Sequence, residues 1–183
     1  MATVISHSIA ALAVGKAFAP PNMPPKFWTL TAICAALPDA DVITFSFNIR
    51  YGDMLGHRGL THSFLFALAV SLLIVPIFFR QVTLGSATWF TLLLYFFIVT
   101  ASHGVLDALT NGGLGVAFFA PFTNNRYFFP WRPIEVSPLG IEPFFTTRVV
   151  AVLLSELTWI WLPSGVVIAV SWVYGRKLGQ FWP

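Results

Sequence analysis

The chain has 183 residues, of which 57% are hydrophobic, 16% aromatic and only 9% charged. Its mean hydropathy of +0.78 is typical of membrane proteins and excludes an ordinary soluble domain. The net charge of +3 is small and the basic residues are scattered, which excludes nucleic acid as a partner and fits lipid headgroups or phosphate better.

Apolar runs broken by Pro, Gly and charge predict an all-α membrane helix bundle with four to five membrane segments. The first covers residues 2–18 and ends at "APPNMPP", because successive prolines cannot continue a helix. The second covers 27–37 and stops at Pro38. Since a full span needs about 20 residues, this segment is either partly sunk in the membrane or continues past a kink into 42–47.

Three further segments follow along the chain. The third begins at residue 61 or 62 and ends at 79, and the fourth covers 87–110. These two are predicted to be the clearest spans. The fifth, 149–174, contains Glu156 and Pro163, so a kinked or tilted helix is expected.

The segment 111–147 has a different composition, rich in Gly, Pro, Asn and aromatic residues. It is too interrupted for a spanning helix and is predicted to be an interfacial loop. With no internal repeat, residues 1–183 are expected to form a single integral-membrane domain.

If the segments alternate across the membrane, the two faces differ. The face opposite Met1 carries five basic residues and no acid in short loops: Lys16, Lys26, Arg80, Arg176 and Lys177. The face of Met1 carries all four histidines, six of the seven acids and five arginines. The five arginines equal in number the five basic residues of the opposite face, so only the shortness of the opposite loops favours that face as cytoplasmic. The face of Met1 is then periplasmic or extracellular.

The rare ionisable residues at this end are imidazoles and carboxylates, the nitrogen and oxygen ligands suited to Zn²⁺, Mn²⁺ or Fe²⁺. His103 and Asp107 are four residues apart, so they share one helical face. Thr61 is the predicted N-cap of the third segment. The predicted ligand set is His7, Asp39, Asp41, His57, His62, His103 and Asp107.

Each of these residues also has an ordinary structural interpretation. His7 alone could be a hydrogen-bonded helix residue, one of the Asp pair could be a helix cap, and His103 with Asp107 could pair without metal. Interfacial arginines commonly anchor to lipid phosphates. Together, however, ionisable groups at membrane depth cost several kcal/mol and tend to mark function.

Three motifs carry a family resemblance. "LPDAD", "HRGLTHSF" and "SHGVLDALTNGG", the last followed by an aromatic "PF" segment, resemble the bacterial inner-membrane family of metal-dependent hydrolases labelled YdjM. The resemblance covers most of the chain, from His7 to about Pro138, and H-R-G-x-T-H-S is its most specific element.

That family is in turn similar, in ligand order, to zinc-dependent phospholipases C and zinc nucleases. Their order of His, Asp, His and His-x-x-x-Asp is matched by His7, Asp39 or Asp41, His57 or His62, and His103 with Asp107. No His follows residue 103, so the later ligands of that group are missing. The resemblance therefore implies one or two ions, unless a glutamate substitutes: Glu135, Glu142 or Glu156.

The predicted cofactor is a divalent metal, Zn²⁺ first, with Mn²⁺, Fe²⁺ or Mg²⁺ as alternatives. An ion held by His103, Asp107 and one of His57 or His62 would lower the pKa of bound water to about 7. A second ion held by His7 would share Asp107. Asp39, or failing it Asp41, would orient the water as general base.

Arginines complete the predicted site. Arg58 would stabilise charge on a phosphate, helped by Arg126 or Arg132 from the loop. The expected activity is hydrolysis of a phosphoester in a phospholipid or another lipid phosphate at the bacterial inner membrane, with the site on the periplasmic face.

Two alternatives from other classes remain. A divalent-cation carrier or channel would gather the same residue types, but near the middle of the membrane and within reach of both sides. A non-catalytic membrane scaffold of a stress response would need no metal. Glu156 is expected to pair with a histidine or arginine, or to be a further ligand, with the structural role preferred.

Overall fold

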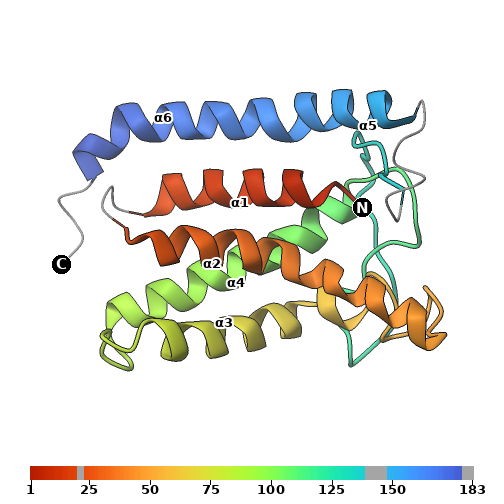
Figure 1. The fold of residues 1–183 in the computed structure, drawn as a ribbon, viewed down its shortest axis with the longest axis horizontal. Coiled ribbons are helices and arrows are strands. Elements are labelled where there is room, and N and C mark those ends of the chain that lie inside the picture. Colours follow the sequence, from red (N-terminus) through yellow and green to blue (C-terminus); the bar gives the residue numbers. More distant parts are fainter. Residues whose placement is uncertain (20–22, 139–147, 179–183) are drawn as a thin grey trace.

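The computed structural model describes residues 1–19, 23–138 and 148–178, and its helices run along one long axis (Figure 1). In chain order the elements are α1 (Val4–Phe18), α2 (Pro25–Ala36), the 3₁₀ segment η1 (Leu37–Phe47), the short 3₁₀ turn η2 (Leu60–His62), α3 (Phe64–Phe78), α4 (Ala87–Ala108), α5 (Arg148–Glu156), the π-helical turn η4 (Leu157–Trp161) and α6 (Leu162–Leu178). The predicted all-α class is confirmed for the part of the chain that the structure describes.

Within the described ranges, three helical stretches are long and apolar enough to cross a membrane: Pro25–Phe47, Ala87–Ala108 and Arg148–Tyr174. The first confirms that the second segment continues past Pro38. Two apolar helices are shorter, Val4–Phe18 and Phe64–Phe78. The expectation that the third segment is among the clearest spans is therefore wrong.

The third segment is short because of how it begins. The N-cap of α3 is Ser63, whose hydroxyl accepts from the amide of Phe66, so the prediction of Thr61 as the cap is wrong. Residues 60–62 form the separate 3₁₀ turn η2 instead. Thr61 and His62 thus stand outside the helix and are available for other contacts.

The helices alternate in direction, as expected. In Figure 1, α1, α3 and the continuous α5–α6 run from the N-terminal end of the molecule to the opposite end, while α2 and α4 run back. The chain start, the 3₁₀ segments and the end of α4 therefore meet at one end of the bundle, and Lys16 and Lys26 lie at the other.

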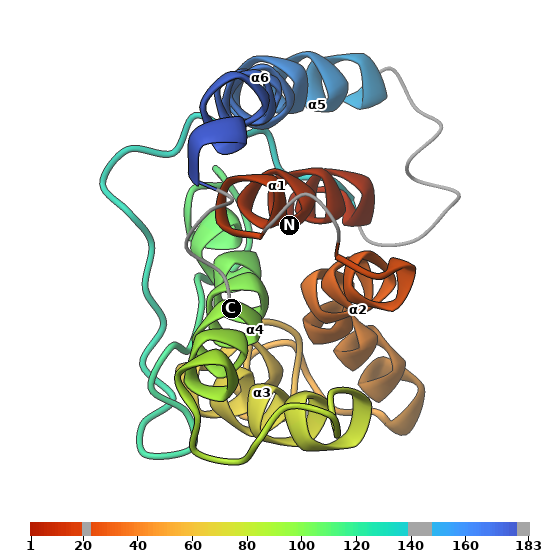
Figure 2. The same ribbon diagram turned by 90° about the vertical axis from the view of Figure 1, so that its left-hand side faces the viewer.

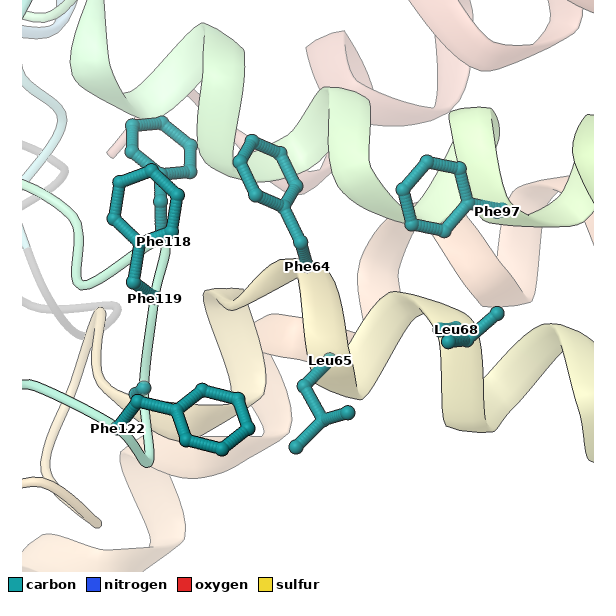
Figure 3. Close-up of a pocket in the computed structure, with 8 residues that line it drawn as sticks. Phe64, Leu65, Leu68, Phe97, Phe118, Phe119 and Phe122 are labelled. Carbon is teal, nitrogen blue, oxygen red and sulfur yellow. The ribbon is translucent and has the colours of Figure 1, made fainter.

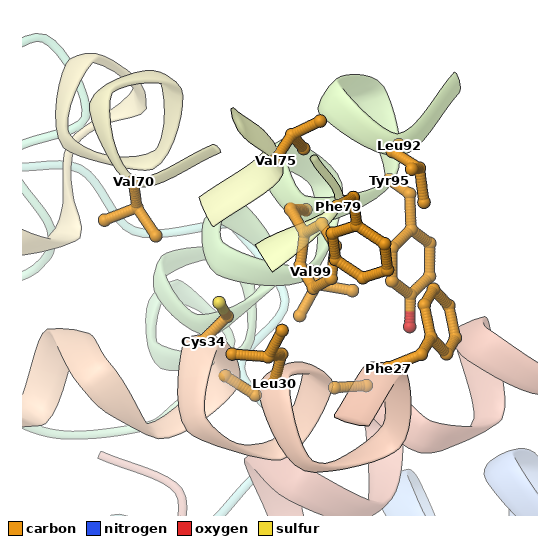
Figure 4. Packing of buried hydrophobic residues seen from close by; sticks show 12 residues of the cluster. Phe27, Leu30, Cys34, Val70, Val75, Phe79, Leu92, Tyr95 and Val99 are labelled. Carbon is orange, nitrogen blue, oxygen red and sulfur yellow. The ribbon is translucent and has the colours of Figure 1, made fainter. Parts of the chain in front are cut away.

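Helix α1 occupies the centre of the bundle. Figure 2 shows α5 and α6 above α1, with α2, α4 and then α3 below it, and α1 contacts α2, α4 and α6. Apolar side chains of α2, α3 and α4 pack together, among them Phe27, Leu30, Val75 and Val99 (Figure 4). This core holds α4 at a fixed position relative to α2 and η1.

The segment after α4 folds back over the end of that helix. Thr110 bridges to Ile134 and Val116 to Tyr127 as isolated β-bridges, without a strand among the described residues. The amide of Phe129 donates to the carbonyl of Ala108. The predicted loop 111–147 is thus anchored to the bundle up to residue 138, and residues 139–147, with Glu142, lie outside the described residues.

Candidate metal centre

All seven predicted ligands lie at the same end of the bundle, and each is at most 6% exposed. They come from four elements that are distant in sequence. His7 lies on α1, Asp39 and Asp41 on η1, and His103 and Asp107 on α4, while His57 and His62 belong to the "GHRGLTH" turn. Burial of so many ionisable groups has to be offset by partners or by a cation.

The "GHRGLTH" turn encloses the carboxylate of Asp41. Nδ1 of His57 lies 2.7 Å from Oδ1 of Asp41, and the Thr61 hydroxyl donates to Oδ2 over 2.6 Å. The amide of Arg58 also donates to Oδ2, and Nδ1 of His62 lies 3.2 Å from the same atom. A carboxylate has about four acceptor sites, so Asp41 is fully engaged. The H-R-G-x-T-H motif is thereby explained as a binding loop for one aspartate.

Backbone geometry keeps this turn compact. Arg58 has φ of 61°, a left-handed conformation that costs a non-glycine residue roughly 1–3 kcal/mol and is found mainly at functional sites. A Cβ on Gly59 would lie 2.1 Å from the carbonyl oxygen of Met54. Glycine is required there because the chain passes against its own backbone.

His62 connects this turn to a second group of side chains. Asp39, His62, His103 and Asp107 each present a ligand atom within 4.8 Å of the others. Because Nδ1 of His62 faces Asp41, its Nε2 points at this group, 3.6 Å from both Asp39 Oδ1 and Asp107 Oδ2. A carboxylate behind a ligating imidazole is the usual way in which proteins fix the ring and its tautomer.

His103 is oriented in the same way by a backbone group. Its Nδ1 donates to the carbonyl of Ala35 over 2.6 Å, so a neutral ring presents a lone pair at Nε2. That nitrogen lies 3.2 Å from Oδ1 of Asp39. Two lone pairs facing each other in a buried site repel, and a cation between them removes the repulsion.

His7 reaches the same group from α1. Its ring stacks on that of His103 with centroids 3.6 Å apart, and its Nε2 lies 3.4 Å from Oδ1 of Asp107. Neither ring nitrogen of His7 has a hydrogen-bond partner. In the neutral ring one nitrogen carries the proton, and the other presents a lone pair that is available to a metal ion.

Asp107 is held from two other sides. Nε of Arg58 lies 3.0 Å from its Oδ2, and the amide of Ala2 donates to its Oδ1 over 3.0 Å. The rest of the Arg58 guanidinium donates to the Gly112 carbonyl and the Thr110 hydroxyl. Arg58 is completely buried, and its contacts fix Asp107 against α4.

At this end of the bundle, several buried side-chain atoms lack a hydrogen-bond partner. Among the described residues, ten buried side-chain N and O atoms lack a hydrogen-bond partner. Eight of the ten belong to candidate ligands: His7, Asp39, His57, His62, His103 and Asp107. Buried polar atoms are nearly always paired, so this concentration of free lone pairs fits a divalent cation.

The charge balance agrees with that inference. Three buried carboxylates (Asp39, Asp41 and Asp107) face one buried guanidinium, which leaves two negative charges when the imidazoles are neutral. Burial alone lowers the pKa of His62, but the close carboxylates of Asp107, Asp39 and Asp41 outweigh it and raise that pKa to about 10. Without a metal, His62 therefore carries a proton at neutral pH and supplies part of the missing positive charge.

The predicted phosphate-binding arginines have different surroundings. Arg126 donates to the backbone carbonyls of His57, Tyr51 and Asp53, so its guanidinium braces the turn before the motif. Arg132 is exposed and lies over the ring of Phe128. Contacts of these arginines, or of Arg58, with a substrate remain predictions.

Two of the three glutamates considered as substitute ligands, Glu135 and Glu156, lie among the described residues. The prediction that Glu156 pairs with a histidine or arginine is wrong: the fully buried carboxylate accepts from Thr3 and Ser6. Glu135 contacts Ser155 through its amide. Sequence reasoning missed the supporting groups, namely the Ala35 carbonyl and the Thr61 hydroxyl. The position of Thr61 inside the H-R-G-x-T-H motif was the signal that could have identified one of them.

Comparison with known proteins gives one consistent result. The family model described as "YdjM inner membrane protein" matches residues 1–179. The inner membrane protein YbcI of Escherichia coli (strain K12) is 38% identical over 172 residues, which cover 94% of this chain and 98% of that protein. No solved structure matches the chain. Both descriptions state a location in the inner membrane and no reaction, so the further likeness to zinc-dependent phospholipases C remains a prediction.

Proposed function

The chain belongs to the YdjM inner membrane protein family, and we propose that it is a metal-dependent hydrolase that cleaves a phosphoester of a phospholipid or another lipid phosphate. The observation that carries the proposal is the set of unpaired ligand atoms around Asp39 and His103. Nε2 of His103 and Oδ1 of Asp39 face each other at 3.2 Å with no hydrogen between them when the ring is neutral.

Five residues would hold the ion or ions: His7, Asp39, His62, His103 and Asp107. Zn²⁺ is the best match for this mixture of imidazoles and carboxylates, with Mn²⁺, Fe²⁺ or Mg²⁺ as alternatives. When bound, such an ion acts as a Lewis acid on a phosphoryl oxygen and supplies hydroxide at neutral pH.

The protein residues of the site then have two roles: some would bind the ion, and others orient those ligands. Asp41 fixes His62 through Nδ1, the Ala35 carbonyl fixes His103, and Arg58 fixes Asp107. Orientation by such outer groups keeps the ligands in place before an ion arrives, which reduces the cost of binding.

Asp39 is the better candidate for general base. Both of its oxygens lack a hydrogen-bond partner, whereas those of Asp41 are engaged by the motif turn. A base has to accept a proton from the attacking water at hydrogen-bond distance. Asp39 has an oxygen to spare for this step, and Asp41 does not.

An apolar pocket beside the site supports a lipid as substrate. It has a volume of about 320 Å³ and is lined by side chains of α3, α4 and the loop, including Phe64, Leu68, Phe97 and Phe118 (Figure 3). Phe64 lies two residues after His62, and its amide donates to the Phe118 carbonyl. An acyl chain in this pocket would lie next to the motif turn.

The proposal is tested on the full-length protein purified in detergent. Bound metal is measured by plasma mass spectrometry, and turnover is measured with a chromogenic phosphomonoester and a phosphodiester. We expect one or two ions per chain and turnover of at least one probe. His103→Ala should lose both, whereas the matched variant Ser102→Ala, one residue earlier on α4, should keep both.

Two outcomes would refute the hydrolase. Bound metal without turnover of either probe would favour a divalent-cation carrier. Absence of metal from the wild-type protein, even after incubation with Zn²⁺ and Mn²⁺, would favour the non-catalytic scaffold.

A further inference from the structure

Glu156 is a carboxylate in the last membrane span, and none of its side chain is exposed. Its Oε2 accepts from the hydroxyls of Thr3 and Ser6, each over 2.7 Å. Its Oε1 accepts from the amide of Thr3. A charged residue at membrane depth is costly, and these three donors all belong to the start of α1.

The π-helical turn directly after Glu156 brings a second side chain to the same place. In an α-helix, residues five apart point about 140° away from each other, because each residue turns the chain by about 100°. A π-helical turn bonds i to i+5 and aligns such residues. Trp161, five residues after Glu156, accordingly donates from Nε1 to the Ser6 hydroxyl over 2.7 Å.

The first turn of α1 leads directly to the metal centre. The amide of His7 donates to the carbonyl of Thr3, and the amide of Ala2 donates to Asp107. His7 differs from His62 and His103 in having no hydrogen-bond partner for either ring nitrogen. Its ring is therefore placed by stacking on His103 and by the position of this helical turn.

We infer that Glu156 is a positioning residue of the metal centre, which acts through His7 by fixing the first turn of α1. The inference rests on the proposed metal centre and adds to it a group from the last span. Thr3 and Ser6 transmit the effect, since they are the residues that Glu156 contacts. Glu156 itself touches no candidate ligand side chain among the contacts of the described residues.

The test is a double-mutant cycle on Zn²⁺ affinity, measured with the full-length protein in detergent by competition with a chromogenic chelator. Loss of an outer-shell partner typically weakens metal affinity about 10–100-fold. We expect Glu156→Gln to weaken affinity in this range, because an amide can no longer accept from all three donors. In a His7→Ala background the same substitution should change affinity less than about twofold.

Two further variants sharpen the result. Ser155→Ala is the matched control: it removes a hydrogen bond between the same helix and the amide of Glu135 without touching α1, and should leave affinity unchanged. If Glu156→Gln does not fold, Ser6→Ala takes its place, because it removes one of the three donors and keeps the charge.

The outcomes separate this inference from the proposed function. If the wild-type protein binds Zn²⁺ but Glu156→Gln leaves affinity unchanged, the positioning role is refuted and the metal centre stands. An equal loss of affinity with and without His7 would show that Glu156 only stabilises the bundle, which also refutes it. If the wild-type protein binds no metal, both ideas fail together.

Discussion

The two aspartates of "LPDAD" should respond to the same substitution in opposite ways. Asp41 accepts hydrogen bonds from His57, from the Thr61 hydroxyl and from the amide of Arg58, while Asp39 has no hydrogen bond to lose. An asparagine oxygen offers about two acceptor sites where a carboxylate offers four. Asp41→Asn therefore leaves about one buried donor unpaired and should lower the free energy of unfolding by about 1–3 kcal/mol.

The two substitutions should affect Zn²⁺ affinity in the opposite order to stability, with the larger loss in Asp39→Asn. Asp41 orients a ligand, so Asp41→Asn should weaken Zn²⁺ binding about 10–100-fold, or about 1.4–2.7 kcal/mol. Asp39→Asn removes a candidate ligand and should weaken binding more. In the metal-free protein its new amide can donate to Nε2 of His103, so its stability should equal or exceed that of the wild type.

The assay combines thermal unfolding in detergent, with chelator present, and Zn²⁺ titration of the same samples. The reasoning is refuted if Asp41→Asn unfolds at the wild-type temperature, or if Asp39→Asn binds Zn²⁺ as tightly as the wild type. A uniform loss of stability in both variants would also refute it, because the two carboxylates would then have equivalent surroundings.

Three further substitutions or conditions test other parts of the site. Gly104→Ala places a Cβ 2.9 Å from the His62 carbonyl oxygen, so it should cost about 1–3 kcal/mol of stability by overpacking; an unchanged melting temperature would contradict this. Arg58→Met leaves Asp107 buried without its ion pair and should lower stability by about 3–5 kcal/mol, and Arg58→Lys should recover only part of that stability. Thermal unfolding in detergent measures both variants. Equal melting temperatures for Arg58→Lys and the wild type would contradict the role of the forked guanidinium. With chelator present, the stability contributed by protonated His62 should be complete below pH 6.5 and lost as pH rises through about 10, because its folded pKa lies above its unfolded value. A melting temperature that rises over this pH range would exclude His62 as the cause. A fall of the same size in His62→Gln would exclude it as well.

Much of the fold could be predicted because the signals are local. Apolar runs and the breaks between them gave the number, order and direction of the helices. The length of the third segment could not be obtained in this way, since Thr61, Ser63 and Phe64 are all compatible with a helix start. What decides between them is the contact of the Thr61 hydroxyl with Asp41, a residue on a different element.

The membership of the site was predictable for a different reason. Ionisable residues are so rare in this chain that a group of them at one membrane face already indicates a common site. The division of labour among them was not predictable, because it depends on pairs distant in sequence. His57 and His62 could not be told apart until both were seen to face Asp41 through Nδ1, with only His62 turning Nε2 to the four-residue group. Glu156 could not be matched with Thr3 and Ser6, at the other end of the chain.

One residue of η1 has an effect well beyond its own turn. Pro38 has no amide hydrogen, and in a 3₁₀ turn that hydrogen would be directed at the carbonyl three residues earlier, which is that of Ala35. This carbonyl instead receives Nδ1 of His103. The imino acid that changes the pitch of one membrane span therefore also selects which tautomer a ring on another span adopts. In this protein, the amide hydrogen that Pro38 lacks thereby determines which nitrogen of His103 carries the proton and which keeps a free lone pair.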